Sequence, residues 1–204
     1  MRPYAASTQM MSPPDVEPIS LTQAKAHLRV DGGDEDALIA MCVVAARERV
    51  EQETRRALIR QQWRAYVAGD FGGAACVELP RPRLTAGDAV VVEYRNAAGV
   101  WTVYTGAQVH AAREPALLWA QVAPGDIGSP VSEQDSVWRA TYWTGYGEAP
   151  EAVPGPLRHA VLMLTAHLFE RREMVISGTI ITEIPKTLDW LVDPYRVPWM
   201  GGTR

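Results

Sequence analysis

The sequence is poor in the residues that mark several common classes of protein. Its 204 residues include only two cysteines, Cys42 and Cys76, which lie far apart and form no Cys-x-x-Cys pair. This spacing indicates neither a zinc site nor a disulfide scaffold, so we expect two reduced thiols. No apolar run is long enough to span a membrane, and no basic segment followed by an apolar stretch opens the chain. We therefore expect no membrane partner.

The chain also lacks an excess of positive charge. It carries 20 lysines and arginines against 24 acidic residues, which gives a formal net charge of −4 at pH 7. A protein that holds nucleic acid tightly through its phosphates normally has a basic patch or stripe. The composition therefore argues against tight nucleic-acid binding. A hydrophobic content of 47% is ordinary for a globular protein and allows a sizeable core.

The usual catalytic motifs are missing as well. The sequence contains no Gly-x-Ser-x-Gly, no His-Glu-x-x-His and no phosphate-binding loop. We expect no catalytic residue, no metal site, no cofactor and no enzymatic activity. One alternative remains, because Asp88, Glu93 and Arg95 resemble the Asp and Glu-x-Lys pattern of metal-dependent nucleases. Arg95 is a poor replacement for the lysine of that pattern, since an arginine stays protonated.

The most apolar long segment of the chain is Pro154 to Glu173. Leu157, Val161, Leu164 and Leu168 recur there at spacings of three and four, as on one face of a helix, and further apolar residues widen that face. A helix with so broad an apolar surface must be covered on several sides. We expect it to form the wall of the core.

These patterns predict an α+β protein. Its expected form is a small bundle of three to four helices with an inserted antiparallel β-unit and an extended C-terminal tail. The predicted divisions are a flexible leader over residues 1–17, a helical core over 18–62 and 150–184, a β-rich insertion over 63–149, and a C-terminal docking segment over 185–204.

Two helices are predicted before the insertion. Ser20 and Gln23 form the Ser-x-x-Gln pattern of a capping box, which predicts a helix from Leu21 to Leu28. A second helix is expected from about Glu35 to Leu58. Its second half becomes strongly charged, so it is either a solvated helix end or a contact with a neighbouring subunit. The residues proposed for that contact are Arg47, Glu51 and Arg55.

The insertion reads as short β-strands separated by turns. Asn96 to Gly99 is a short loop that ends in glycine, and it predicts a β-hairpin. The two prolines within Leu79 to Leu84 exclude a central strand, so this segment should cross at the edge of the sheet. The predicted strands are Trp63–Ala68, Cys76–Leu79, Ala89–Tyr94, Val100–Thr105, a pair around Val109 and Leu117–Gln121, and Val137–Trp143.

The last residues of the chain are rich in aromatic side chains. A short helix is predicted from about Thr187 to the residue before Pro194. Chain ends normally fray, whereas Trp190, Tyr195 and Trp199 are residues of the kind that anchor interfaces. The tail therefore either folds back onto its own domain or docks into another protein.

Taken in order, these features resemble the head-tail connector, or adaptor, proteins of tailed bacteriophages and gene transfer agents. The resemblance covers roughly Glu17 to Trp199. It rests on the stretches Glu17–Asp31, Asp34–Ile39, Arg56–Ile59 running into Gln62-Trp63, Leu79–Pro82, Tyr142–Gly147, Val153-Pro154, Phe169–Glu173 and Leu191–Val197.

The resemblance implies a structural virion protein located in the neck, at the head-tail interface, and assembled in the cytoplasm of the bacterial host. It implies a ring of identical subunits, commonly a dodecamer, that binds the portal protein and a stopper or tail-completion protein while DNA passes through its channel. Another neck component, such as a stopper or a tail-completion protein, is the alternative. The residues expected to bind the portal are Trp190, Leu191, Tyr195, Arg196, Trp199 and Met200.

Overall fold

The computed structural model describes residues 5–68, 74–81, 83–84, 88–96, 98–110, 117–121, 136–170 and 186–197. It has the predicted α+β class, with helices and antiparallel sheets. The chain divides into two compact units. We call them the helical unit, residues 15–59 and 147–196, and the β-unit, residues 1–14, 60–146 and 197–204. No helix within the described ranges is long and apolar enough to cross a membrane.

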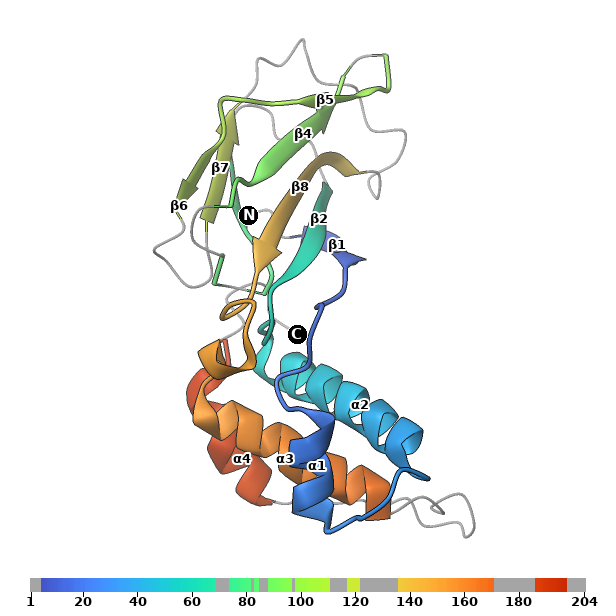
Figure 1. Cartoon of the computed structure of the whole chain (residues 1–204). Coiled ribbons are helices and arrows are strands. Elements are labelled where there is room, and N and C mark those ends of the chain that lie inside the picture. Colours follow the sequence, from blue (N-terminus) through green and yellow to red (C-terminus); the bar gives the residue numbers. More distant parts are fainter. Residues whose placement is uncertain are drawn as a thin grey trace, which may run out of the picture. The chain divides into compact units, whose positions relative to one another are not determined.

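In the part of the helical unit that the structure describes there are four α-helices and two short 3-10 helices, coloured along the chain in Figure 1. They are α1 (Leu21–Leu28), α2 (Asp36–Thr54), η1 (Pro150–Ala152), α3 (Gly155–Glu170), α4 (Lys186–Val192) and η2 (Asp193–Tyr195).

Helix α1 begins and ends as its sequence predicts. The Gln23 N–H donates to the Ser20 hydroxyl over 3.1 Å, and the Ser20 N–H donates to the Gln23 side chain over 2.9 Å. This reciprocal pair is the capping box, and it satisfies two backbone donors that would otherwise lack partners. The helix ends at Arg29, whose backbone is left-handed with φ 57°.

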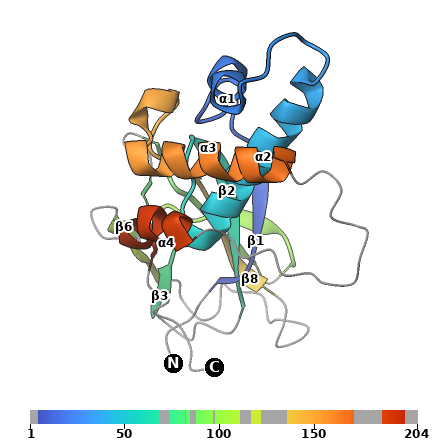
Figure 2. The ribbon, with the colours of Figure 1, turned by 90° about the horizontal axis from the view of Figure 1, so that it is seen from below.

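Helix α3 is the centre of the helical unit, as its apolar breadth predicts. It contacts α1, α2 and α4, and Figure 2 shows it between α1 and α4. Burying each large apolar side chain stabilises the fold by about 1.5–3 kcal/mol. Residues 171–173 of the predicted helix lie outside the described ranges. The buried residues of α3 are Leu157, Ala160, Val161, Leu164, Thr165 and Phe169.

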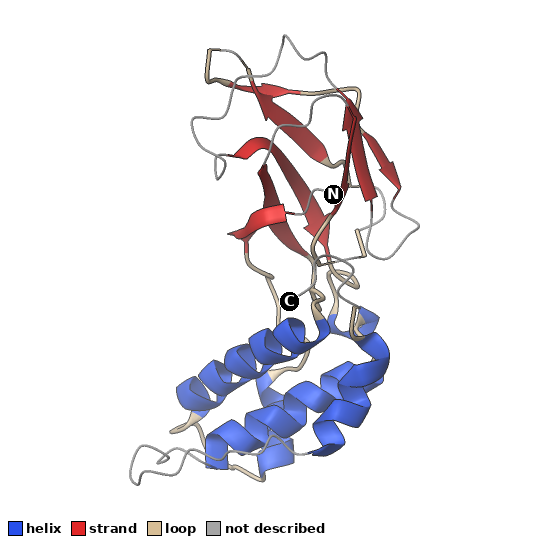
Figure 3. Cartoon of the chain, turned by 180° about the vertical axis from the view of Figure 1, so that it is seen from behind, coloured by secondary structure: helices blue, strands red, loops and turns tan. Residues whose placement is uncertain are grey.

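Among its described residues, the β-unit has two antiparallel sheets, seen as red arrows in Figure 3. The larger has the strand order β1-β2-β8-β4-β5, and the smaller has the order β3-β7-β6. The strands are β1 (Ala5–Ser12), β2 (Gln61–Ala68), β3 (Ala74–Glu78), β4 (Val91–Arg95), β5 (Trp101–Val103), β6 (Gln108–His110), β7 (Leu117–Gln121) and β8 (Ser136–Thr144).

One face of the larger sheet forms the core of the β-unit. Alternate residues of β2 and β8 point into it, including Trp63, Ala65, Trp138 and Tyr142, as the two-residue period of a strand requires. The hairpin predicted at Asn96–Gly99 joins β4 to β5. The Gly99 N–H donates to the Asn96 carbonyl over 2.8 Å, and Gly99 has φ 79°.

The first strand corrects the prediction of a flexible leader. Residues 5–12 form β1, which pairs antiparallel with β2 at one edge of the larger sheet. Most of its side chains are exposed, so the strand gains little from apolar burial and is held mainly by backbone hydrogen bonds to β2. Because its side chains are mostly exposed, the strand has no apolar pattern from which the sequence could predict it.

Candidate functional site

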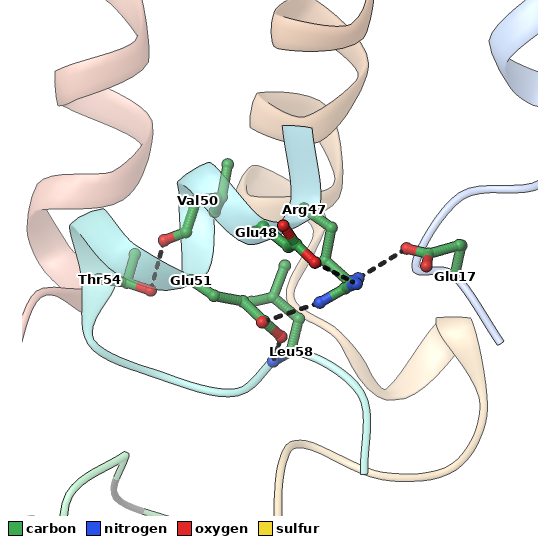
Figure 4. Close-up of polar contacts among 7 residues, drawn as sticks. All are labelled: Glu17, Arg47, Glu48, Val50, Glu51, Thr54 and Leu58. Atoms are coloured by element: carbon green, nitrogen blue, oxygen red, sulfur yellow. Dashed lines mark hydrogen bonds and ion pairs between the residues drawn. The ribbon is translucent and has the colours of Figure 1, made fainter. Parts of the chain in front are cut away.

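A buried arginine organises the end of α2 (Figure 4). The Arg47 side chain donates from Nε to Glu17 over 2.9 Å and from Nη1 to Glu51 over 3.0 Å. The Glu48 carboxylate lies 3.5 Å from Nη2. Arg47 is only 3% exposed and Glu51 only 2%. An arginine this deeply buried needs such partners, because an unpaired charge in the interior is strongly destabilising.

Glu51 also binds the backbone of the turn that follows α2. Its Oε1 accepts the Leu58 backbone N–H over 2.8 Å, while its Oε2 accepts from Arg47. Arg55 has a left-handed backbone, with φ 57°, and closes α2 at Thr54. The helix predicted to reach Leu58 therefore stops four residues earlier, because Glu51 takes up a backbone donor of the turn that follows.

Burial raises the pKa of Glu17, and the neighbouring Arg47 opposes this shift. Glu17 lies at the end of the predicted leader, and its partly buried ion pair with Arg47 connects that end to α2. We call Glu17, Arg47 and Glu51, with the Leu58 N–H, the Arg47 network.

The Arg47 network corrects the choice of Arg47 and Glu51 as surface contacts. Their spacing of four does pair them, as expected on a helix. Both side chains are nevertheless covered by their own chain, so neither lies at a surface in this conformation. Arg55, the third residue proposed for a subunit contact, is exposed.

The C-terminal segment packs onto the helical unit through one side of α4. Leu188 and Val192, four residues apart, are buried, and α4 contacts both α3 and α2. Trp190 lies between them in sequence and is 77% exposed. A tryptophan left this exposed on an ordered helix is a candidate anchor for a partner, since tryptophan is enriched in interface hot spots.

Arg196 fixes the end of this segment. Its guanidinium lies 3.0 Å from Asp189, 2.7 Å from Asp193 and 3.2 Å from Glu53 of α2. In addition, Arg56 donates from Nε to the Tyr195 carbonyl over 2.6 Å. These contacts fasten the segment after α4 to the C-terminal end of α2. They hold α4 in place, and the exposed Trp190 therefore has a defined position.

The remaining residues predicted to bind the portal have mixed positions. Leu191 and Tyr195 are partly exposed. Trp199 and Met200 lie outside the described ranges. Sequence reasoning did not find Glu53 as a partner of Arg196 or Glu17 as a partner of Arg47. These contacts join residues far apart in the chain, and no local spacing indicates them.

The residues of the nuclease alternative are engaged with arginines. Arg60 binds Asp88 through two hydrogen bonds, of 3.0 and 3.1 Å, and Arg139 binds Glu93 through two, of 2.6 and 2.8 Å. The hydrogen bonds from Arg139 lower the pKa of Glu93. Among the described residues, no three His, Cys, Asp or Glu side chains are placed to hold a metal ion.

Comparison with solved structures shows where this architecture occurs. A chain from the neck of an empty gene-transfer-agent (GTA) particle, computed with C6 symmetry, matches with a TM-score of 0.69 and 21% identity, over 97% of this chain and 99% of that one. The chain has the fold of a GTA neck protein. A chain from the neck of the native particle, computed with C12 symmetry, matches with a TM-score of 0.60 and 22% identity, over 96% and 100%.

A chain of the native GTA virion also matches this GTA-neck fold, with a TM-score of 0.64 and 21% identity, over 95% of this chain and 99% of that one. No protein-family model and no curated protein sequence matches the chain. The likeness thus lies in the fold and spans almost the full length of both chains.

Proposed function

We propose that this chain is a head-tail adaptor, a structural virion protein that forms a ring beneath the portal and joins the DNA-filled head to the tail. The observation that carries this proposal is the likeness, over nearly the whole chain, to chains of GTA necks. Both units of the chain take part in that match, so it is not a resemblance of one common motif.

The C-terminal segment is the proposed portal-docking element. A side chain that is exposed in the isolated chain but carried on a fixed helix can bind without first being ordered. Trp190 meets both conditions, because Leu188 and Val192 fix α4 and Arg196 fixes the chain beyond it. Trp199 and Met200 are proposed to extend the same contact.

A ring of identical subunits also needs two different contact faces on each copy. We propose that the end of α2 supplies part of one face through Arg55, which is exposed just beyond the Arg47 network. The modest net charge of −4 suits a ring through which DNA must move without being held.

Portal binding is tested by replacing Trp190 with alanine. The side chain is already 77% exposed, so we expect no measurable change in thermal stability but a loss of binding of about tenfold or more, as is typical for an interface tryptophan. The measurement is a pull-down, followed by titration, with the portal protein that is assembled with this chain.

The matched control is Met41→Ala, because Met41 is 69% exposed on α2 and equally free of the core. Unchanged portal affinity in Trp190→Ala would contradict the docking proposal. Binding to a tail-side protein, with none to the portal, would instead favour the alternative of a stopper or tail-completion protein.

A further inference from the structure

The two edges of the larger sheet lack the charges that usually protect such edges. Among the described residues, β1 and β5 each pair on one side only. An edge strand offers a row of unpaired backbone N–H and C=O groups, and natural proteins usually place charged residues or prolines there. Neither β1 nor β5 contains a charged residue or a proline. The charges of this sheet lie instead on its three inner strands, at Arg64, Arg139, Glu93 and Arg95.

Large apolar side chains are also exposed at both edges. Met10 and Met11 of β1 are exposed, and so are Val103 of β5 and Val100 just before it. An uncharged edge strand with exposed apolar side chains is a site at which another strand pairs. The backbone groups and the side chains of these two edges therefore call for the same kind of partner, which is an extended strand.

The two edges have regular stretches of similar length. From Ser7 to Met10, four residues of β1 pair with β2 in unbroken register, between two register shifts. On the other edge, the three residues Trp101 to Val103 of β5 pair with β4. Each edge thus offers a short regular segment, and the two segments fit each other in length.

The direction of the strands sets how two copies of the chain could meet. Every neighbouring pair in the larger sheet is antiparallel, so β1, β8 and β5 all run in the same direction. A second copy in the same orientation would present its β1 to β5 as a parallel strand. This contact joins two different surfaces, as a closed ring of identical subunits requires. Pairing of β1 with β1 would instead give a two-fold dimer.

We propose that β5 of one copy pairs in parallel with β1 of the next, so that the larger sheet continues from subunit to subunit. The proposal rests on the proposed function, which requires a ring of identical copies. A pairing of three or four residues forms only a few backbone hydrogen bonds, so one such contact is weak. Closure of the ring makes the contacts collective.

The first test places a charge at the β5 edge with Val103→Lys. Lysine on an edge strand opposes pairing with another strand. Val103 is 59% exposed, so the melting temperature should not change. The variant should lose the association between copies that the natural chain shows. Sedimentation velocity measures this association over a range of concentrations, for the chain alone and for the chain mixed with the portal protein proposed as its partner.

The matched control is Val91→Lys. Val91 is 43% exposed and lies on the same face of the sheet as Val103, since Val103 is opposite Glu93 and Glu93 is two residues from Val91. Its strand β4, however, is paired on both sides. The control should associate as the natural chain does. Equal losses in the two variants would mean that the face of the sheet, and not its edge, makes the contact.

Cross-linking identifies the two strands that meet. Gln9 of β1 is opposite Arg64, on the same face as Val103. Gln9→Cys and Val103→Cys chains are mixed before assembly and treated with a thiol-reactive linker that spans a register offset of two residues, about 7 Å. The mixture should give a cross-linked pair that neither variant gives alone. The natural chain shows the background from Cys42 and Cys76, and Met41→Cys in place of Val103→Cys should add nothing to it.

Three results would overturn the proposal. They are a natural chain that stays monomeric both alone and with the portal, an unchanged association of Val103→Lys, and cross-linking of Gln9→Cys to itself in place of the mixed pair. A ring bound to the portal without the mixed cross-link would overturn the strand pairing and leave the adaptor proposal standing. The mixed cross-link in a chain that leaves the portal bare would overturn the adaptor proposal alone.

Discussion

Arg47 is a charge that the fold has taken almost completely out of water. Its partners come from three parts of the helical unit, since Glu17 precedes α1, Glu51 lies one turn further along α2, and the Leu58 N–H joins through Glu51. Burying an ion pair gives little net stability, but removing one partner leaves the other charged and unpaired in the interior. The Arg47 network therefore favours the one arrangement of these three segments in which all its charges are paired, because any other arrangement would leave a buried charge unpaired.

Replacing Arg47 with alanine should lower the free energy of unfolding by about 3–5 kcal/mol, because Glu51 would be left buried without its cation. The measurement is urea denaturation followed by helical circular dichroism.

Arg49→Ala is the control, since Arg49 lies two residues away, is exposed, and pairs with Glu53 at the surface. Its cost should stay below about 1 kcal/mol. An equal loss of unfolding free energy in the two variants would mean that the Arg47 network stabilises the fold no more than a surface ion pair does.

The sequence predicts the pairing within this network but not its burial. The spacing of Arg47 and Glu51 indicates an ion pair on any helix. Whether that pair faces water depends on Glu17 and on the turn before Leu58, which the fold brings over it. A local pattern of charges is the same on a solvated helix and in an interior where every charge is paired, so the sequence alone predicts a surface position for these residues.

Helices with a clear capping or apolar pattern can be predicted from the sequence, whereas β1 cannot. The capping box of Ser20 and Gln23 fixes the start of α1, and the broad apolar pattern of Leu157 to Leu164 gives α3 its central place. The strand β1 contains few β-branched or aromatic residues. It exists because the edge of β2 offers unpaired backbone groups, and a partner of that kind cannot be read from β1 alone.

Removing residues 1–12 should expose the backbone of β2 to solvent. We expect amide hydrogen exchange to accelerate by about tenfold or more at β2 residues whose N–H groups face β1, and to stay unchanged in α2 and α3. Hydrogen exchange resolved by NMR measures this.

The β2 amides that face β8 serve as the internal control, because β2 and β8 remain paired from Gln61 to Ala68. Unaltered protection along the β1-facing edge would show that β1 contributes nothing to the sheet.

At the scale of the whole molecule, the chain combines a helical unit and a β-unit in the fold of GTA neck chains. The helical unit carries the exposed Trp190 and Arg55, which are the proposed contacts with the portal and with the next copy. The net charge of −4 suits the proposed ring, because DNA must move through it without being held.

The most direct test is cryo-electron microscopy of this chain mixed with the portal protein proposed as its partner. The adaptor proposal predicts a closed ring of this chain, coaxial with the portal, in which the segment around Trp190 inserts into the portal surface. Particles in which the portal stays bare while the chain remains unassembled or binds only a tail-side protein would contradict it.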